Sequence, residues 1–343
     1  MQALERFFRS TVVAGTMLAG VSGAFGQIAG DTSTAAPSGT TASDLGLVEL
    51  TDDPTQQELF QEVVRAAAKE DPAGTAESAQ YFNLYGPFRF KNDTEFDVTL
   101  HVPRKDELFG LDVSHYTPPA FPIEQLATRN VLFLYMKTTQ GSGLDGSFAS
   151  FWARAGRLPK GDEVHRGAYH FLTCGDPNVP AATWGKSQAE TFVMVVQANG
   201  GLMPTDMPPA VDLEWDRTKT EHDRWTCRKP GEILATVKAF LGEVEARLHR
   251  KPIIYTARSW WRERMGPESA FSELSGYPVW LADYSRQSRA SEKPPTVNGV
   301  QGVLWQFTDS AGMATGFDPK FDANVYKGPK ESFLSLLQVV DFR

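Results

Sequence analysis

Residues 210–215 read Ala-Val-Asp-Leu-Glu-Trp, a strand-like apolar run that carries two acidic residues. Seven similar apolar runs occur at Leu108–Ser114, Val131–Lys137, Gly167–Leu172, Ile253–Thr256, Val279–Ala282, Val303–Phe307 and Asp322–Tyr326. The longer gaps hold helical patterns, clearest at Ser187–Ala198 and Glu232–Leu248. Eight strands alternating with helices predict an α/β fold, a (β/α)8-like (TIM-type) barrel rather than an open sheet. Some later helices look very short, so we expect the barrel to be irregular.

The amino-terminal third of the chain differs in pattern from the rest. We expect the barrel to occupy residues 105–343, behind a linker and N-terminal extension over residues 27–104. The extension begins with a stretch rich in Thr, Ser, Ala and Gly, and a short helix is predicted after it, with Asp53 as its cap and Pro54 in its first turn. Residues 81–104 alternate as strands do, with Asn92-Asp93 as a candidate turn.

The first residues predict an export signal. Arg6 and Arg9 form a basic start, and an uncharged stretch follows from Ser10 to Gly30 with two candidate cleavage points. We assign residues 1–26 to a signal peptide. A membrane anchor is the alternative, but the apolar part is short and rich in Gly, Ser and Thr. We therefore expect an exported protein, periplasmic or extracellular, without stable membrane insertion after cleavage.

Charge and cysteine content narrow the function classes. The 343 residues carry a formal net charge of −8, which argues against nucleic-acid binding driven by the overall charge of the chain. The two cysteines, Cys174 and Cys227, are too few and too far apart for a structural zinc site. In an exported chain a single disulfide is favoured over two free thiols. We expect no metal and no cofactor.

Two acidic residues in the run at 210–215 point to catalysis. Asp212 and Glu214 are two apart on a strand, so their carboxyl groups face the same side, roughly 7 Å apart along the chain. Burying both in an apolar strand should raise the pKa of at least one. Glycosidic bond cleavage needs a protonated carboxyl beside an ionised one. A salt-bridged pair is the alternative, but Asp112 and Asp322 on strands flanking the barrel opening favour the catalytic interpretation.

Aromatic residues cluster at the same strand ends. Sugar rings have apolar faces that stack on aromatic planes, so such residues are expected to bind a glycan. The candidates are Tyr116, Tyr169, Trp215, Trp280, Tyr284 and Trp305.

Taken in order, these segments resemble the glycoside hydrolase family 25 lysozymes, the Chalaropsis-type muramidases. The resemblance covers about residues 108–328 and rests on Gly110–His115, Gly167–Phe171, Val211–Glu214, Pro252–Thr256, Pro278–Tyr284, Trp305–Phe307 and Phe321–Asn324. It implies an irregular barrel that cleaves the β-1,4 bond between N-acetylmuramic acid and N-acetylglucosamine in peptidoglycan. It also implies Glu214 as general acid/base, Asp212 as its partner carboxylate, and Asp112 and Asp322 as supporting acids.

Two features stand out against that family pattern. Where the family commonly has Lys-Ala-Thr-Glu-Gly, this chain has Lys-Thr-Thr-Gln-Gly at residues 137–141, so Gln140 replaces a carboxylate. Lys137 of this segment is expected to contact substrate. Cys174 and Cys227 follow neighbouring strands, so a disulfide between them is geometrically reasonable. We expect it to hold in place the loops that form one wall of the cleft.

The mechanism stays open at this point. Glu214 is expected to protonate the leaving sugar, while Asp212 attacks the anomeric carbon, activates water or steadies the substrate's own N-acetyl group, the option the resemblance favours. A metal-dependent hydrolase using the same acidic cluster is one alternative. A catalytically inactive peptidoglycan-binding protein is another, with Gln140 as its first sign. Peptidoglycan glycan strands are the expected partner, and protein partners and oligomeric state are left open.

Overall fold

A computed structural model of the chain describes residues 40–50, 88–97, 101–218, 223–284, 288, 291–313, 317 and 320–342. All of these residues fall within one compact unit, Ser38–Arg343. The predicted signal peptide and the helix predicted from Asp53 lie outside the described residues. Within the described part of the chain, no helix combines the length and the apolar character needed to cross a bilayer.

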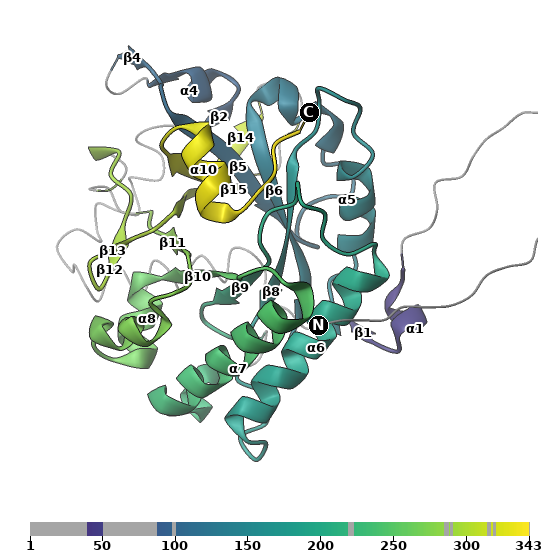
Figure 1. Ribbon diagram of the computed structural model, residues 1–343, viewed down its shortest axis with the longest axis vertical. Coiled ribbons are helices and arrows are strands. Elements are labelled where there is room, and N and C mark those ends of the chain that lie inside the picture. The colour runs from purple at the N-terminus through teal and green to yellow at the C-terminus, as the bar shows by residue number, and fades with distance from the viewer. Residues whose placement is uncertain are drawn as a thin grey trace, which may run out of the picture. The chain divides into compact units, whose positions relative to one another are not determined.

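Eight strands close into a barrel at the centre of the molecule (Figure 1). In chain order they are β5 (Glu107–Val113), β6 (Val131–Gln140), β8 (His165–Phe171), β9 (Ala210–Leu213), β10 (Ile253–Ala257), β11 (Val279–Ala282), β14 (Leu304–Met313) and β15 (Phe321–Lys327). The ring closes because β6 pairs with both β5 and β8. The expected α/β class and closed eight-stranded barrel are confirmed, and each strand overlaps one of the eight apolar runs.

The last strand is the main irregularity of the barrel. β15 runs antiparallel to both β14 and β5, whereas the other barrel pairs are parallel. Its first residues therefore lie beside the carboxyl ends of the other strands, and Asp322 pairs in register with Asp112 of β5. Because β15 is reversed, Asp322 at its start lies at the same end of the barrel as Asp112, which stands near the carboxyl end of β5.

Helices cover the outside of the barrel. The longer ones are α5 (Phe148–Ala155), α6 (Ala181–Ala198), α7 (Pro230–Leu248), α8 (Arg258–Met265) and α10 (Lys330–Leu337). Short 3-10 turns occur at η1 (Ile123–Gln125), η2 (Ala127–Arg129), η3 (Arg224–Cys227) and η4 (Glu268–Leu274).

α6 and α7 lie side by side (Figure 1) and approach closely at one glycine. A Cβ at Gly185 would lie 2.2 Å from the carbonyl oxygen of Thr236. α6 starts six residues before the expected Ser187 and includes this glycine, which disfavours a helix in isolation. Packing against α7 explains why the helix nevertheless continues through it.

Parts of the N-terminal extension add to the barrel sheet. α1 (Ala42–Leu45) is followed by β1 (Val48–Glu49), which pairs with β7 (Gly143–Leu144), and β2 (Arg89–Phe90) pairs with the far end of β14. Phe88 and Phe90 pack their rings against Phe109, with centroids 5.3 and 6.2 Å away.

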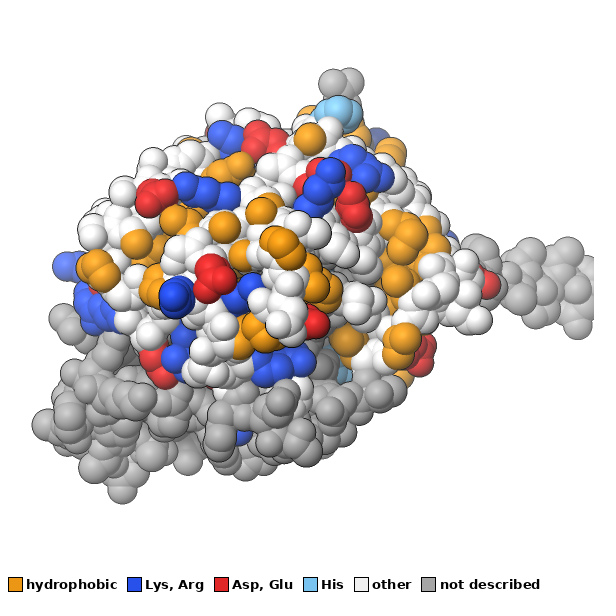
Figure 2. All heavy atoms as spheres, turned by 90° about the horizontal axis from the view of Figure 1, so that it is seen from below, with side chains coloured by type: hydrophobic (Ala, Val, Ile, Leu, Met, Phe, Trp, Pro, Cys, Tyr) orange, Lys and Arg blue, Asp and Glu red, His pale blue; other side chains and the backbone are white. Residues whose placement is uncertain are grey.

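Of the strand-like segment expected at 81–104, the residues that the structure describes form several short elements. α4 (Asn92–Glu95) occupies the candidate turn, β3 (Phe96–Asp97) pairs with β4 (Val102–Pro103), and elsewhere β12 (Thr296–Val297) pairs with β13 (Val300–Gln301). On the face shown in Figure 2, the basic and acidic side chains that are described are interspersed.

Candidate active site

A pocket opens at the carboxyl end of the parallel strands. It brings together nine of the residues predicted from the sequence: Asp112, Tyr116, Lys137, Tyr169, Asp212, Glu214, Trp280, Tyr284 and Asp322. Eight further residues line it: Val113, Ser114, Thr117, Phe171, Tyr255, Gln306, Asp309 and Phe321. All four predicted catalytic acids therefore face one space.

Asp212 and Glu214 leave β9 on the same face, as their spacing requires. Leu213 between them is fully buried on the opposite face, Asp212 is 6% exposed, and Glu214 is partly open to the pocket. The two carboxyl groups lie close enough for each to affect the pKa of the other. Asp212 Oδ1 is buried without a hydrogen-bond partner among the described residues. One acceptor is therefore left unused at the pocket wall.

Burial shifts the titration of this pair upward. It raises the pKa of Glu214 to about 7, against the opposing positive charge of Lys137. Burial and the neighbouring Glu214 charge raise the pKa of Asp212 well above its usual range. Two close carboxyl groups in a low-dielectric site cannot both ionise readily, so the pair keeps a proton at neutral pH.

Asp112 and Asp322 form a second carboxyl pair, across the β5–β15 ladder. Asp112 Oδ2 accepts hydrogen bonds from Gln306 Nε2 at 2.9 Å and from Asn324 Nδ2 at 2.7 Å. Burial, followed by the charge of Asp112, raises the pKa of Asp322 well above its usual range, and a hydrogen bond links the two carboxyl groups. Burial also raises the pKa of Asp112, but its two amide donors favour the ionised form. Of the two, Asp322 is therefore the one whose neutral form is favoured more strongly.

Two amides are themselves held in place by the pocket wall. Gln306 Oε1 accepts hydrogen bonds from the hydroxyls of Tyr255, at 2.8 Å, and Tyr284. Asn324 Oδ1 accepts from Trp280 Nε1 at 2.8 Å. Because both amide oxygens are occupied, both amide nitrogens point at Asp112. Tyr255 and Gln306 were not among the predicted site residues, although both lie in segments that carry the family resemblance.

Trp215 and Trp305 do not line the pocket. Their side chains are 1% and 2% exposed, and each indole N–H is used elsewhere, by Glu263 Oε2 at 3.2 Å and by the carbonyl of Asp283 at 2.8 Å. Strand alternation gives the reason, since each neighbours an inward-facing residue, Glu214 or Gln306, in sequence. The other predicted aromatic residues do line the pocket.

Lys137 brings a positive charge to the pocket from β6. It is 4% exposed, its Nζ lies 4.9 Å from the ring centre of Phe171, and it donates a hydrogen bond to Gln140 Oε1. Gln140 is buried and is not part of the pocket wall. The residue that replaces the family carboxylate is therefore linked to the pocket through Lys137.

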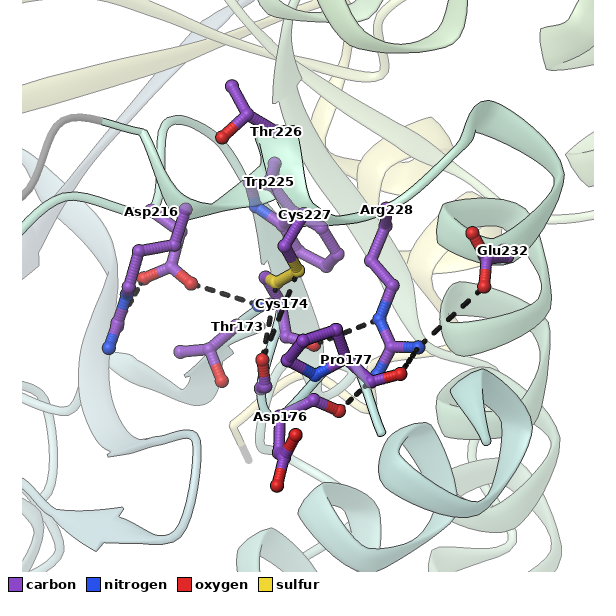
Figure 3. The surroundings of a disulfide bond; sticks show 12 residues. Thr173, Cys174, Asp176, Pro177, Asp216, Trp225, Thr226, Cys227, Arg228 and Glu232 are labelled. Atoms are coloured by element: carbon purple, nitrogen blue, oxygen red, sulfur yellow. Dashed lines mark hydrogen bonds and ion pairs between the residues drawn. A yellow bond between two sulfur atoms is a disulfide. The ribbon is translucent and has the colours of Figure 1, made fainter. Parts of the chain in front are cut away.

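A disulfide joins Cys174, just after β8, to Cys227 in the η3 turn (Figure 3). The backbone N–H of Cys174 donates to Asp216 Oδ2 at 2.9 Å, two residues after Glu214. The guanidinium of Arg228 donates to the carbonyls of Asp176 and Val179 at 2.7 and 2.9 Å. The loops that follow β8 and β9 are thus tied to each other.

A closed α/β barrel with paired carboxyl groups and aromatic walls at the carboxyl end of its strands is the arrangement of a glycoside hydrolase. Among the described residues, no group of three or more His, Cys, Asp or Glu side chains is placed to hold a metal ion.

Comparison with known proteins gives the family. The model for glycosyl hydrolases family 25 matches residues 111–316, more than half of the chain, and the chain belongs to this family. An N,O-diacetylmuramidase from Chalaropsis sp. is 27% identical over 208 residues, covering 59% of this chain and 88% of that protein. Lysozyme M1 from Streptomyces globisporus is 25% identical over 240 residues, covering 66% and 70%. The family resemblance inferred from the sequence is confirmed, and the chain is a glycoside hydrolase.

Solved structures share the fold. A bacterial lysozyme from Streptomyces coelicolor aligns with a TM-score of 0.54 at 23% identity, covering 67% of this chain and 97% of that one. A family GH25 lysozyme from Aspergillus fumigatus aligns with a TM-score of 0.53 at 21% identity, covering 67% and 99%.

Proposed function

We propose that the protein is a lysozyme of the N-acetylmuramidase type, which hydrolyses the β-1,4 bond between N-acetylmuramic acid and N-acetylglucosamine in bacterial peptidoglycan. The names of its relatives, N,O-diacetylmuramidase and lysozyme, supply the substrate class. The observation that carries the proposal is the Asp212–Glu214 pair in a pocket with aromatic walls, where burial raises the pKa of both carboxyl groups.

In the proposed mechanism Glu214 is the general acid. It is the more exposed of the pair, and a pKa of about 7 supports a protonated carboxyl at neutral pH. It gives its proton to the glycosidic oxygen as the bond to the anomeric carbon breaks. After the leaving sugar departs, the ionised Glu214 removes a proton from the attacking water.

Asp212 is proposed to act through the substrate's own acetamido group. Its Oδ1 is a buried acceptor without a partner among the described residues, suited to an amide N–H. With that N–H held, the acetamido oxygen attacks the anomeric carbon and water later opens the resulting ring. Asp112 and Asp322 are proposed to support the developing positive charge, and Tyr116, Lys137, Tyr169, Trp280 and Tyr284 to bind the glycan.

The proposal extends to where the enzyme works. An export signal at residues 1–26, as the sequence indicates, would deliver the enzyme to the periplasm or the exterior, where peptidoglycan is accessible. Amino-terminal sequencing of the exported protein should find cleavage near residue 26, and an intact amino terminus on the exported protein would contradict this part.

The variant Glu214→Gln tests the catalytic assignment. It keeps the size and hydrogen bonding of the side chain but cannot donate the proton, so turnover should fall by about a thousandfold or more. Binding to insoluble peptidoglycan, measured by co-sedimentation, should stay near the wild-type level. Wild-type turnover in this variant would overturn the role of Glu214, and binding without turnover in the wild type would indicate a binding protein.

A further inference from the structure

The end of strand β9 is held by side chains on both sides. The strand pairs with β10 up to Leu213, whose carbonyl also accepts a hydrogen bond from Thr256 Oγ1 at 2.8 Å. Glu214 is the next residue, one beyond the last ladder pair. Its carbonyl accepts a hydrogen bond from the indole Nε1 of Trp225 at 3.0 Å. Trp225 therefore contacts the backbone of the residue proposed as the acid.

Trp225 is fixed by its own surroundings. Its side chain is fully buried and packs edge-on against Trp260, with ring centres 6.0 Å apart. Its backbone N–H donates to Asp223 Oδ1 at 3.1 Å, and the same oxygen accepts from the backbone N–H of Asp216 at 2.9 Å. Asp223 is in turn paired with Arg264 of α8. The η3 turn and the segment after Glu214 thus share one carboxylate.

Figure 3 shows the disulfide between Cys174 and Cys227 beside Trp225 and Asp216, and with the Trp225–Glu214 hydrogen bond these contacts form a ring. Cys227 lies two residues after Trp225 and is bonded to Cys174. Cys174 donates its backbone N–H to Asp216, which lies two residues after Glu214. A path therefore runs from Glu214 through Trp225, the disulfide and Asp216 back to the strand end.

We propose that Trp225 is a positioning residue for Glu214, and that the Cys174–Cys227 disulfide holds Trp225 in that position. The inference rests on the proposed role of Glu214. Trp225 acts on the backbone carbonyl and so sets where the carboxyl group stands relative to Asp212 and the substrate. Small displacements of a catalytic group cost rate more than binding, so loss of this contact lowers kcat and leaves KM nearly unchanged.

The variant Trp225→Phe removes the indole N–H, and Trp261→Phe is its matched control. Trp261 is also fully buried, and its Nε1 has no hydrogen-bond partner among the described residues. Both substitutions remove the same atoms from a buried site, but only one breaks a bond to Glu214. We expect kcat on peptidoglycan to fall about five- to tenfold in Trp225→Phe, with less than about a twofold change in Trp261→Phe. Equal kcat values in the two variants would overturn the inference.

The disulfide is tested by Cys174→Ser/Cys227→Ser and by reduction of the wild type. Alkylation without reductant should leave the mass of the wild type unchanged, because both thiols are in the disulfide. Loss of the disulfide should lower kcat in the same direction as Trp225→Phe. Combined with Trp225→Phe it should add little, because both changes act through one contact. Fully additive losses would show that the disulfide does not act through Trp225.

A measurement that needs no turnover separates this inference from the proposed function. With 13C-labelled glutamate, the carboxyl signal of Glu214 is identified by its loss in Glu214→Gln. Its titration midpoint should move in Trp225→Phe and in the reduced protein, and stay in place in Trp261→Phe. If the wild type cuts no peptidoglycan but the titration midpoint of Glu214 moves as described, the proposed muramidase function is overturned. The proposal that Trp225 positions Glu214 is then still supported. An unmoved midpoint overturns the positioning role, and if Trp225→Phe does not fold, the double serine variant carries the same test.

Discussion

At the scale of single residues, the pocket depends on how four clustered carboxyl groups affect one another's pKa. Asp212 with Glu214 and Asp112 with Asp322 form two pairs, in each of which one carboxyl group affects the pKa of the other. Lys137 is the cation that lowers the pKa of both Asp212 and Glu214. Removing or neutralising one of these charges should therefore change the titration of the others in a known direction.

Lys137→Met tests this coupling through the pH dependence of kcat. Glu214 donates a proton in the proposed mechanism, so activity should fall as the pH rises through about 7. Because the charge of Lys137 lowers the pKa of Glu214, its removal should move this fall to higher pH by about half a unit or more. Gln140→Glu, which places an anion beside Lys137, should move it in the same direction to a smaller extent. If the activity of Lys137→Met falls at the same pH as that of the wild type, or at a lower pH, the charge of Lys137 does not lower the pKa of Glu214.

Asp322→Asn should stabilise the folded protein at neutral pH. The pKa of Asp322 is raised in the folded state, so the unfolded chain ionises it first as the pH rises from its usual value of 3.8. The folded state is thus favoured at low pH and loses that advantage as the pH rises through the folded pKa. Asparagine can still donate to Asp112 without carrying a charge. We expect a gain of about 1 kcal/mol in the free energy of unfolding at pH 7, shrinking toward pH 4.

Urea unfolding at the two pH values measures this gain. A stabilisation that is the same at pH 4 and pH 7 would show that the charge of Asp322 is not its cause.

All four acids predicted from the sequence line the pocket, whereas two of the predicted aromatic residues do not. Asp212 and Glu214 followed from their spacing, because alternation on a strand decides which residues share a face. Trp215 and Trp305 were chosen for their position at strand ends alone, and the same alternation turns both away from the pocket. Gln306 lies next to Trp305 and faces inward for that reason. Its role in orienting Asp112 depends on contacts across the barrel that no local pattern contains.

At the scale of elements, the strands could be predicted because barrel strands are buried and read as apolar runs. The direction of β15 was not predicted, since an apolar run does not say which way a strand runs. The start of α6 was also missed, because Gly185 interrupts the helical pattern and only its contact with α7 explains it.

A matched pair of helix glycines tests the α6–α7 contact. Gly185→Ala would place a Cβ 2.2 Å from the backbone oxygen of Thr236, which cannot move independently of its helix. We expect a loss of about 1–3 kcal/mol in the free energy of unfolding. Gly242→Ala on α7, where nothing lies within 4 Å of the added Cβ, should gain about 0.5–1 kcal/mol. Chemical denaturation measures both changes in the free energy of unfolding. If both variants gain stability or both lose it, the close approach of α7 is not the reason that residue 185 is glycine.

At the scale of the whole molecule, the extension is partly built into the catalytic unit. β1 and β2 add to β7 and β14, and Phe90 is fully buried against the barrel. Arg104 lies 2.8 Å from Glu107 and 3.3 Å from Glu292, linking the segment before the barrel to the barrel itself. Two-residue strands carry too little sequence pattern to be predicted, and their positions follow from the surfaces they pack against.

The central claim is that this pocket cuts the muramic acid bond of peptidoglycan with Glu214 as the acid. The most direct measurement is digestion of purified peptidoglycan by the mature protein, followed by borohydride reduction of the new ends and mass spectrometry. The account predicts reduced muramic acid at the new ends, and none with Glu214→Gln. Reduced glucosamine at those ends, or no new ends on several types of wall, would contradict it.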